Sequence, residues 1–199
     1  MRKTWIPCLT LSLFILICMV PATARAGDWT GNVNFLLGQK QMDKNDWEPV
    51  EDQSEFGAEV TWGKEDWPIQ IATDVFSSSD DQSGVDPLVG AFDLEVKTSE
   101  LGIGVRKVWE KKKVRPYVGG GLAYVGVSID ANTEVLGTGS ADDSALGAWA
   151  GGGIFWRLGP RFNLGFAARF SKATVTSADL EGGGTHAGLI LGWGWPASK

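Results

Sequence analysis

The chain has 199 residues, one histidine, two cysteines and a formal net charge of −6 at pH 7. The length suits one domain, and the acidic balance excludes a nucleic-acid partner, because backbone phosphates require a basic face. Both cysteines, Cys8 and Cys18, precede residue 27, so the remaining residues can form no disulfide and no cysteine metal site.

Residues 1–26 have the pattern of a secretory signal peptide. Arg2 and Lys3 precede an apolar run from Ile6 to Val20, and residues 24–26 form a small-x-small cleavage site before Gly27. The alternative is an N-terminal membrane anchor, but the run contains polar residues and is short for a bilayer of about 30 Å. We expect residues 1–26 to be removed and residues 27–199 to form one domain. The loss of three positive residues moves the net charge from −6 to −9.

Alternating polar and apolar residues, which are typical of a strand, begin directly after this segment. The first two candidate strands are 28–39 and 54–63, and a third follows the short segment 64–68. On the apolar face of these three lie Trp29, Val33, Phe35, Leu37, Phe56, Ala58, Val60, Trp62, Ile69, Ile71, Thr73 and Val75. The opposite face carries polar residues, among them Asn32, Glu55, Glu59 and Asp74.

The fourth candidate strand, 91–109, changes parity along its length. Its apolar residues are even-numbered at first and then odd-numbered: Phe92, Leu94, Val96, Leu101, Ile103, Val105 and Trp109. A shift of one residue moves every side chain to the other face of a strand. The pattern therefore predicts a β-bulge near 97–100, or a bend where the strand leaves a bilayer.

The last four candidate strands are 115–129, 145–158, 162–171 and a final one that ends at Trp195. The fifth is rich in glycine and its facing is ambiguous, although Val125, Val127 and Ile129 favour an odd-numbered apolar face. The others alternate clearly, with outer faces formed by Leu146, Ala148, Ala150, Ile154, Trp156, Leu158, Phe162, Leu164, Phe166, Ala168, Phe170, Ala187, Leu189, Leu191, Trp193 and Trp195.

The gaps between the candidate strands alternate in length. The long, polar gaps are 42–53, 77–90, 130–144 and 176–184, and the short ones are 64–68, 110–113 and 159–161. Outer-membrane barrels have long loops on the far side and short turns on the near side. The pattern thus predicts an all-β fold, an eight-stranded antiparallel up-and-down transmembrane β-barrel, with both ends on the near side and the first and last strands paired.

A soluble sandwich or lipocalin-like barrel would also show a period of two. Two observations favour the membrane barrel. The polar face combines glycines with isolated charges, as a narrow lumen requires, and the apolar face carries bulky residues without charge. Tryptophans also cluster near the predicted near-side strand ends, where an interfacial belt is expected: Trp29, Trp62, Trp67, Trp109, Trp156, Trp193 and Trp195.

Several stretches resemble the small eight-stranded outer-membrane barrel families related to the OmpA transmembrane domain. They are Glu100–Arg106 (ELGIGVR), Arg115–Leu122 (RPYVGGGL), Gly151–Leu158 (GGGIFWRL) and the seventh strand. The resemblance spans nearly all of residues 27–195 and implies an architecture and an outer-membrane location. Such families commonly end in an aromatic residue that assists assembly, whereas here Trp195 is followed by four further residues.

His186 is the one candidate for enzymatic chemistry. Barrel enzymes that modify lipid acyl chains combine a histidine with a serine and an acid. The parity of the last strand turns His186 toward the lumen, whereas lipid substrates approach the outer wall. We therefore interpret it as a polar residue of the lumen or rim and predict no catalytic residue and no enzyme.

Three groups of charges remain as candidates for binding or gating. The inward charges Glu59, Asp74, Arg106 and Arg169 are expected to pair inside the lumen, as buried charges must, and could form a plug or gate. Oxygen ligands for Ca²⁺ are present in the long gaps at Asp80, Asp81, Asp86, Asp142, Asp143, Asp179 and Glu181. Their spacing matches no calcium loop, so a solvated rim is the favoured interpretation and we predict no metal and no cofactor.

A basic cluster at one short turn is the third group. It consists of Lys107, Lys111, Lys112, Lys113 and Arg115. These residues can contact anionic headgroups, although a solvated turn is the simpler interpretation.

Together these features predict an integral outer-membrane barrel with a largely filled lumen and a structural or surface-interaction role. One alternative is a conduit for small hydrophobic molecules, and a second is a lipid A-modifying barrel enzyme. The expected partners are outer-membrane lipids, lipopolysaccharide and the barrel assembly machinery, with no nucleic acid, and the expected state is a monomer.

Overall fold

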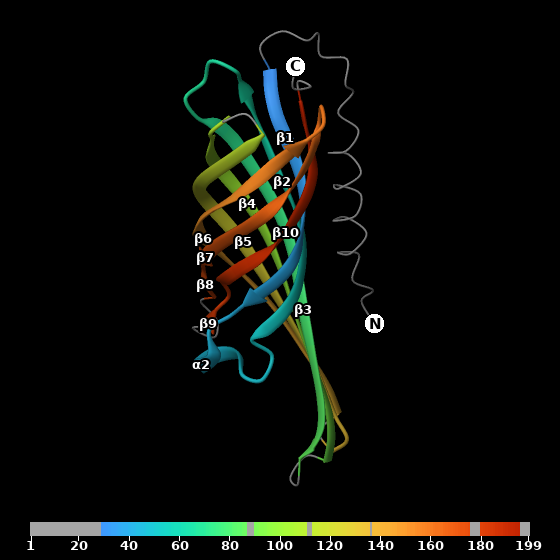
Figure 1. Cartoon of the computed structure of the whole chain (residues 1–199). Coiled ribbons are helices and arrows are strands. Elements are labelled where there is room, and N and C mark those ends of the chain that lie inside the picture. Colours follow the sequence, from blue (N-terminus) through green and yellow to red (C-terminus); the bar gives the residue numbers. More distant parts are fainter. Residues whose placement is uncertain (1–28, 87–89, 111–112, 136, 176–179, 196–199) are drawn as a thin grey trace.

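The computed structural model of the chain describes residues 29–86, 90–110, 113–135, 137–175 and 180–195. The predicted signal peptide, residues 1–26, lies outside these ranges. Within them, no helix is long and apolar enough to cross a membrane. The strands form a closed barrel in the order β1-β10-β7-β6-β5-β4-β3-β2, which confirms the predicted fold class (Figure 1).

The barrel strands are β1 Trp29–Gln41, β2 Asp52–Lys64, β3 Gln70–Asp86, β4 Gly90–Val108, β5 Val114–Thr133, β6 Gly137–Leu158, β7 Phe162–Lys172 and β10 Gly184–Trp195. A short helix, α2 Lys44–Trp47, lies between β1 and β2, and a two-stranded ribbon, β8 Thr174–Val175 with β9 Leu180–Glu181, lies between β7 and β10.

The first and last strands close the barrel, as predicted. β1 and β10 pair in antiparallel fashion from Gly31↔Trp195 to Gln41↔Thr185. Closure matters because every backbone polar group that faces hydrocarbon needs a partner, and a closed sheet leaves no edge inside the bilayer.

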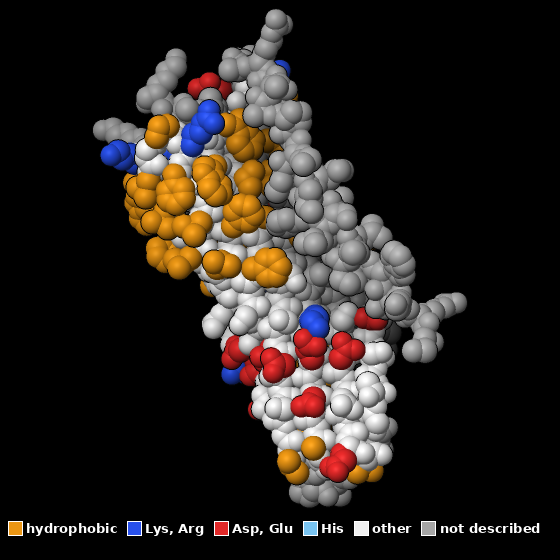
Figure 2. All heavy atoms as spheres, turned by 90° about the vertical axis from the view of Figure 1, so that its right-hand side faces the viewer, with side chains coloured by type: hydrophobic (Ala, Val, Ile, Leu, Met, Phe, Trp, Pro, Cys, Tyr) orange, Lys and Arg blue, Asp and Glu red, His pale blue; other side chains and the backbone are white. Residues whose placement is uncertain are grey.

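Bulky apolar side chains cover the outer wall of the barrel. Among the exposed residues are Leu37, Phe56, Leu101, Ile103, Leu122, Phe166, Phe170 and Leu189. On the face shown in Figure 2, apolar side chains gather in a band, which we call the apolar belt, and most of the acidic side chains lie beyond it. Trp29, Trp67, Trp109, Trp156 and Trp193 are exposed at the end of the barrel where the short turns lie, and an aromatic girdle is expected there.

Two of the predicted long loops are strands instead. β3 and β4 pair without interruption to Asp86↔Gly90, and β5 and β6 pair to Thr133↔Gly137. The segments 77–86 and 137–144 therefore continue the barrel wall beyond the belt (Figure 1). The alternation of polar and apolar residues does not reveal these strands, because both of their faces lie largely in water rather than against lipid. Their residues are therefore polar or glycine on both faces.

We call this part of the sheet the extension. It comprises Asp80–Asp86 of β3, Gly90–Lys97 of β4, Ser128–Thr133 of β5 and Gly137–Ser144 of β6.

The predicted bulge in β4 is wrong. The register with β3 advances one residue at a time from Gly90 to Arg106. The alternative prediction, a change where the strand leaves the bilayer, agrees better with the structure. The apolar residues change from one face to the other while the strand stays regular. Leu101 and Ile103 point outward to the belt, whereas Val96 is buried and Leu94 packs against the same inner core.

The predicted facing of β5 is also wrong. Val125 and Val127 are buried inside the barrel, and the even-numbered Leu122 and Tyr124 are exposed on its wall. The inner residues pack with the far-side loop segments into one core cluster that contains Met42, Trp47, Val50, Ala72, Val96, Ala123, Val125, Val127, Ala145, Trp149 and Ala173. An apolar cluster thus fills part of the barrel interior, which the predicted polar lumen did not include, although Lys40, Gln53 and Thr98 are also buried toward the far side.

Candidate functional site

The four predicted inward charges meet in the centre of the lumen. Arg106 Nη2 lies 3.0 Å from both carboxylate oxygens of Asp74 and 3.3 Å from Glu59 Oε1. Arg169 Nη1 donates to Asp74 Oδ2 at 2.8 Å. Because the strands β2, β3, β4 and β7 each contribute one of these residues, the network joins opposite walls of the barrel. The prediction that these charges pair is confirmed.

Neighbouring groups bond to further atoms of this network, although the Nε atoms of Arg106 and Arg169 have no hydrogen-bond partner among the described residues. Arg106 Nη1 donates to Thr61 Oγ1 at 2.8 Å, and the Tyr117 hydroxyl donates to Glu59 Oε2 at 2.8 Å. The ring of Trp149 lies 4.3 Å from Arg169 Cζ and 5.6 Å from Arg106 Cζ. A desolvated guanidinium beside an indole face gains cation–π stabilisation.

A glycine in the wall makes room for these long side chains. A Cβ at Gly102 would lie 2.9 Å from Arg169 Nη2 and 3.1 Å from Trp149 Nε1. The predicted combination of glycines and isolated charges on the inner face therefore has a steric reason, because a narrow lumen holds a long charged residue only opposite a small one.

A second group of buried residues extends the network toward the far side. The Ser171 hydroxyl donates to Glu100 Oε2 at 2.8 Å and lies 3.0 Å from His186 Nε2. His186 Nδ1 lies 2.6 Å from Glu55 Oε1, and Arg169 Nη2 bonds Glu100. His186 is 1% exposed and faces the lumen, as its parity predicted.

The spacing of Ser171, His186 and Glu55 is that of a serine–histidine–acid triad, an arrangement that the sequence analysis did not predict. Two features distinguish this cluster from a hydrolytic centre. The serine hydroxyl donates to Glu100 rather than to the histidine, and Ser171 is 1% exposed inside the lumen. A nucleophile must reach its substrate, and these residues lie on the opposite side of the wall from the acyl chains.

In the central and far parts of the lumen, the buried charges of these two groups and of Lys40 nearly balance. Glu55, Glu59, Asp74 and Glu100 are buried carboxylates, and Lys40, Arg106 and Arg169 are buried cations. His186 supplies a fourth positive charge whenever it is protonated. Because unpaired buried charge is costly, this balance indicates that the groups fill the lumen as one structural unit.

Both ends of the lumen are filled as well. At the near side, Arg157 donates to Asn163 Oδ1 and to Asn32 Oδ1, each at 2.6 Å. At the far side, Trp47 Nε1 donates to the Glu181 carbonyl at 2.8 Å, and Lys40 Nζ donates to the Gly182 carbonyl at 3.0 Å. We call the far-side layer the cap. It consists of Met42–Glu51 and Leu180–Gly183.

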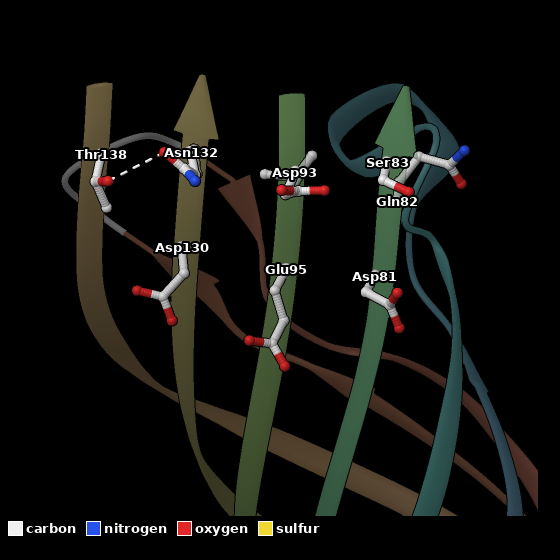
Figure 3. A pocket seen from close by; sticks show the side chains of 10 residues that line it. Asp81, Gln82, Ser83, Asp93, Glu95, Asp130, Asn132 and Thr138 are labelled. Atoms are coloured by element: carbon white, nitrogen blue, oxygen red, sulfur yellow. Dashed lines mark hydrogen bonds between the residues drawn. The ribbon is translucent and has the colours of Figure 1, made fainter. Parts of the chain in front are cut away.

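The outer face of the extension carries a shallow acidic groove of about 410 Å³. Asp81, Glu95 and Asp130 are cross-strand neighbours in one row over β3, β4 and β5, and Figure 3 shows their carboxylates side by side. A second row contains Ser83, Asp93 and Asn132. Like charges directly opposite each other destabilise a sheet, so this face favours an approaching cation.

The other predicted charges do not form one site. Asp81 and Asp142 lie on the extension, whereas Glu181 belongs to the cap and accepts from the Ala173 N–H. The Asp86 side chain and Asp179 lie outside the described residues. Among the described residues, no group of three or more His, Cys, Asp or Glu side chains is arranged to hold a metal ion.

The basic cluster at the short turn is only partly described. Arg115 Nη1 pairs with Glu110 at 2.5 Å, and Lys113 is exposed. Lys111 and Lys112 lie outside the described ranges.

Solved outer-membrane proteins have a fold similar to that of this barrel. A major outer membrane protein of Thermus thermophilus aligns with a TM-score of 0.57 at 11% identity, over 85% of this chain and 99% of that one. The attachment invasion locus protein Ail of Yersinia pestis, solved with the heparin analogue sucrose octasulfate, aligns with a TM-score of 0.55 at 12% identity, over 84% and 99%. No protein-family model and no curated protein sequence matches the chain.

At these identities the likeness concerns the fold. Besides this fold, the described residues form an apolar belt, an aromatic girdle and a filled interior. The chain is thus a small eight-stranded β-barrel with an apolar belt, and its fold is similar to that of solved outer-membrane proteins.

Proposed function

We propose that this barrel does not conduct solutes and acts at the cell surface, where the extension presents an acidic sheet face to cationic partners. The observation that carries the proposal is the row Asp81, Glu95 and Asp130, which stands beyond the apolar belt on three neighbouring strands. Lys97, which pairs with Glu95 at 2.7 Å, offsets only part of this negative charge.

Outer-membrane lipids and lipopolysaccharide surround the belt of a monomer that the barrel assembly machinery inserts after removal of residues 1–26.

The filled interior supports this role over that of a conduit. The cap, the central ion pairs and the Arg157 layer occupy successive levels of the lumen. A conduit for small hydrophobic molecules would need one of these layers to move aside.

Binding of an oligolysine peptide to the barrel in nanodiscs tests the proposal. A variant with Asp81→Asn and Asp130→Asn is expected to bind about tenfold more weakly, since two carboxylates of the row are neutralised. The matched control, Glu65→Gln with Asp66→Asn, removes two exposed charges from a near-side turn and is expected to bind like the native protein. Binding should weaken as salt rises. Equal affinity of the two double variants would contradict the proposal.

The lipid A-modifying alternative rests on the Ser171–His186–Glu55 spacing. It requires Ser171 to reach acyl chains through a wall that the structure shows closed. We expect purified protein to release no fatty acid from lipid A, and the variants His186→Ala and Ser171→Ala to change nothing in that assay. Release that both substitutions abolish would establish the enzyme.

A further inference from the structure

Within the part of the chain that the structure describes, one edge of the extension has no neighbouring strand. β3 pairs with β2 only as far as Ser54↔Ser79, whereas its pairing with β4 continues to Asp86↔Gly90. From Asp80 to Val85, β3 therefore has a partner strand among the described residues on one side alone. Such an edge is a template for an additional strand.

The direction of the backbone groups on this edge follows from one hydrogen bond. The Glu134 N–H donates to the Ala91 carbonyl at 2.9 Å, so odd-numbered residues at this end of β4 bond to β5 and even-numbered ones bond to β3. In an antiparallel ladder the N–H and C=O of one residue point to the same neighbour. Since Gln82 faces Leu94 and Gly84 faces Phe92, the N–H and C=O groups of Asp81, Ser83 and Val85 point away from the sheet.

The opposite edge of the extension is less open. By the same alternation, the even-numbered residues of β6 point outward there. The Ser144 N–H, however, already bonds to Asp143 Oδ1 at 2.6 Å, and β6 resumes pairing with β7 only at Ala148↔Lys172. A strand added to β6 would therefore find one N–H of β6 already bonded. Among the described residues, the N–H groups of β3 from Asp81 to Val85 make no such bond to a side chain.

The charges beside the β3 edge select the kind of strand that can be added. A second copy of the same edge would add its own Asp80 and Asp81 to the carboxylates already present here, and charged side chains protect edges against such pairing. A cationic side chain opposite Asp81 would instead lie next to the row formed with Glu95 and Asp130. Val85, which is 82% exposed, offers an apolar contact near the tip of the same edge.

We propose that the β3 edge, Asp80–Val85, binds an extended cationic polypeptide segment as an additional strand of the extension. Backbone hydrogen bonds to Asp81, Ser83 and Val85 would hold the segment, and its basic residues would lie over the acidic row. The inference rests on the proposed surface-interaction function and specifies both the class of partner and how that partner binds.

The probe is a short peptide that alternates lysine and valine, with binding measured on the full barrel in nanodiscs. Ser83→Pro removes one outward N–H without disturbing the pairing to β4, because proline is tolerated where an edge strand faces solvent. We expect this variant to bind about tenfold more weakly and the control Ser83→Ala to bind like the native protein. Unchanged mobility on a heat-modifiability gel shows that both variants are folded.

A second peptide tests strand addition on the native protein. It has the same charge but carries N-methyl groups on alternate residues, on the face that would bond to β3. We expect this peptide to bind about tenfold more weakly than its unmethylated parent. If the methylated peptide and Ser83→Pro both bind normally while the Asp81→Asn/Asp130→Asn variant does not, strand addition is wrong and the acidic-face proposal stands. If that double variant also binds normally, both proposals fail.

Discussion

Asp74 holds the central network together, because its carboxylate accepts from Arg106 and from Arg169. We expect Asp74→Asn to lower the free energy of unfolding by about 3–5 kcal/mol, since it removes the negative charge that two buried guanidinium groups share. Urea unfolding in lipid vesicles, followed by tryptophan fluorescence, measures this. The matched control is Thr73→Val, on the outer side of the same strand. A loss no larger than that of the control would show that the pair contributes little.

Ser171 tests whether the far-side cluster is structural. We expect Ser171→Ala to cost about 1–3 kcal/mol, because Glu100 and His186 each lose a buried hydrogen-bond partner. The control Ser99→Ala changes a serine on the outer side of β4. Identical unfolding curves for the two variants would argue that the cluster makes no net contribution to stability.

The sequence predicted part of this site. Glu59, Asp74, Arg106 and Arg169 were identified because alternation alone turns them inward. Glu100 was not, because the supposed bulge at 97–100 left its facing open. The sequence could not predict the contacts of His186, because Ser171 and Glu55 lie beside it only once the barrel has closed. Alternation tells which side of a wall a residue faces, but not which residues of other strands it meets there.

The contact between β4 and β5 depends on a pair of facing glycines. Gly104 and Gly121 are cross-strand partners, and a Cβ at Gly121 would lie 2.1 Å from the Ile103 carbonyl oxygen. We expect Gly121→Ala to force the strands apart and to reduce the yield of heat-modifiable barrel severalfold. Gly139→Ala is the control, because a Cβ there meets nothing within 4 Å. Equal yields would mean that the wall adjusts without penalty.

Strand existence was predictable, and strand length was not. The eight barrel strands appear in the sequence because lipid on one side and lumen on the other impose a period of two. That contrast ends beyond the belt, so Ser77–Asp86 and Gly137–Ser144 resemble loops in sequence. The same change of surroundings explains the parity of β4, where Val96 faces an inner core while Leu101 faces lipid.

The molecule as a whole is closed by several layers, so removing one should not open it. We expect planar-bilayer recordings of the native protein to show no large steady conductance. Trp47→Ala, which weakens the cap by removing its bond to the Glu181 carbonyl, should behave in the same way, because the ion pairs of Arg106 and Arg169 remain beneath it. Steady channels in the native protein would overturn the filled lumen, and channels in the variant alone would identify the cap as the gate.

The change of apolar face along β4 also fixes how deep the protein sits. If the molecule sank inward by one residue pair per strand, Glu95 and its neighbours would approach the hydrocarbon, where ionised side chains are strongly disfavoured. If it rose by the same amount, Leu101 and Ile103 would meet water. The depth of the barrel in the membrane is therefore restricted in both directions. The residues of the barrel wall thus set the height of the β3 edge above the lipid headgroups.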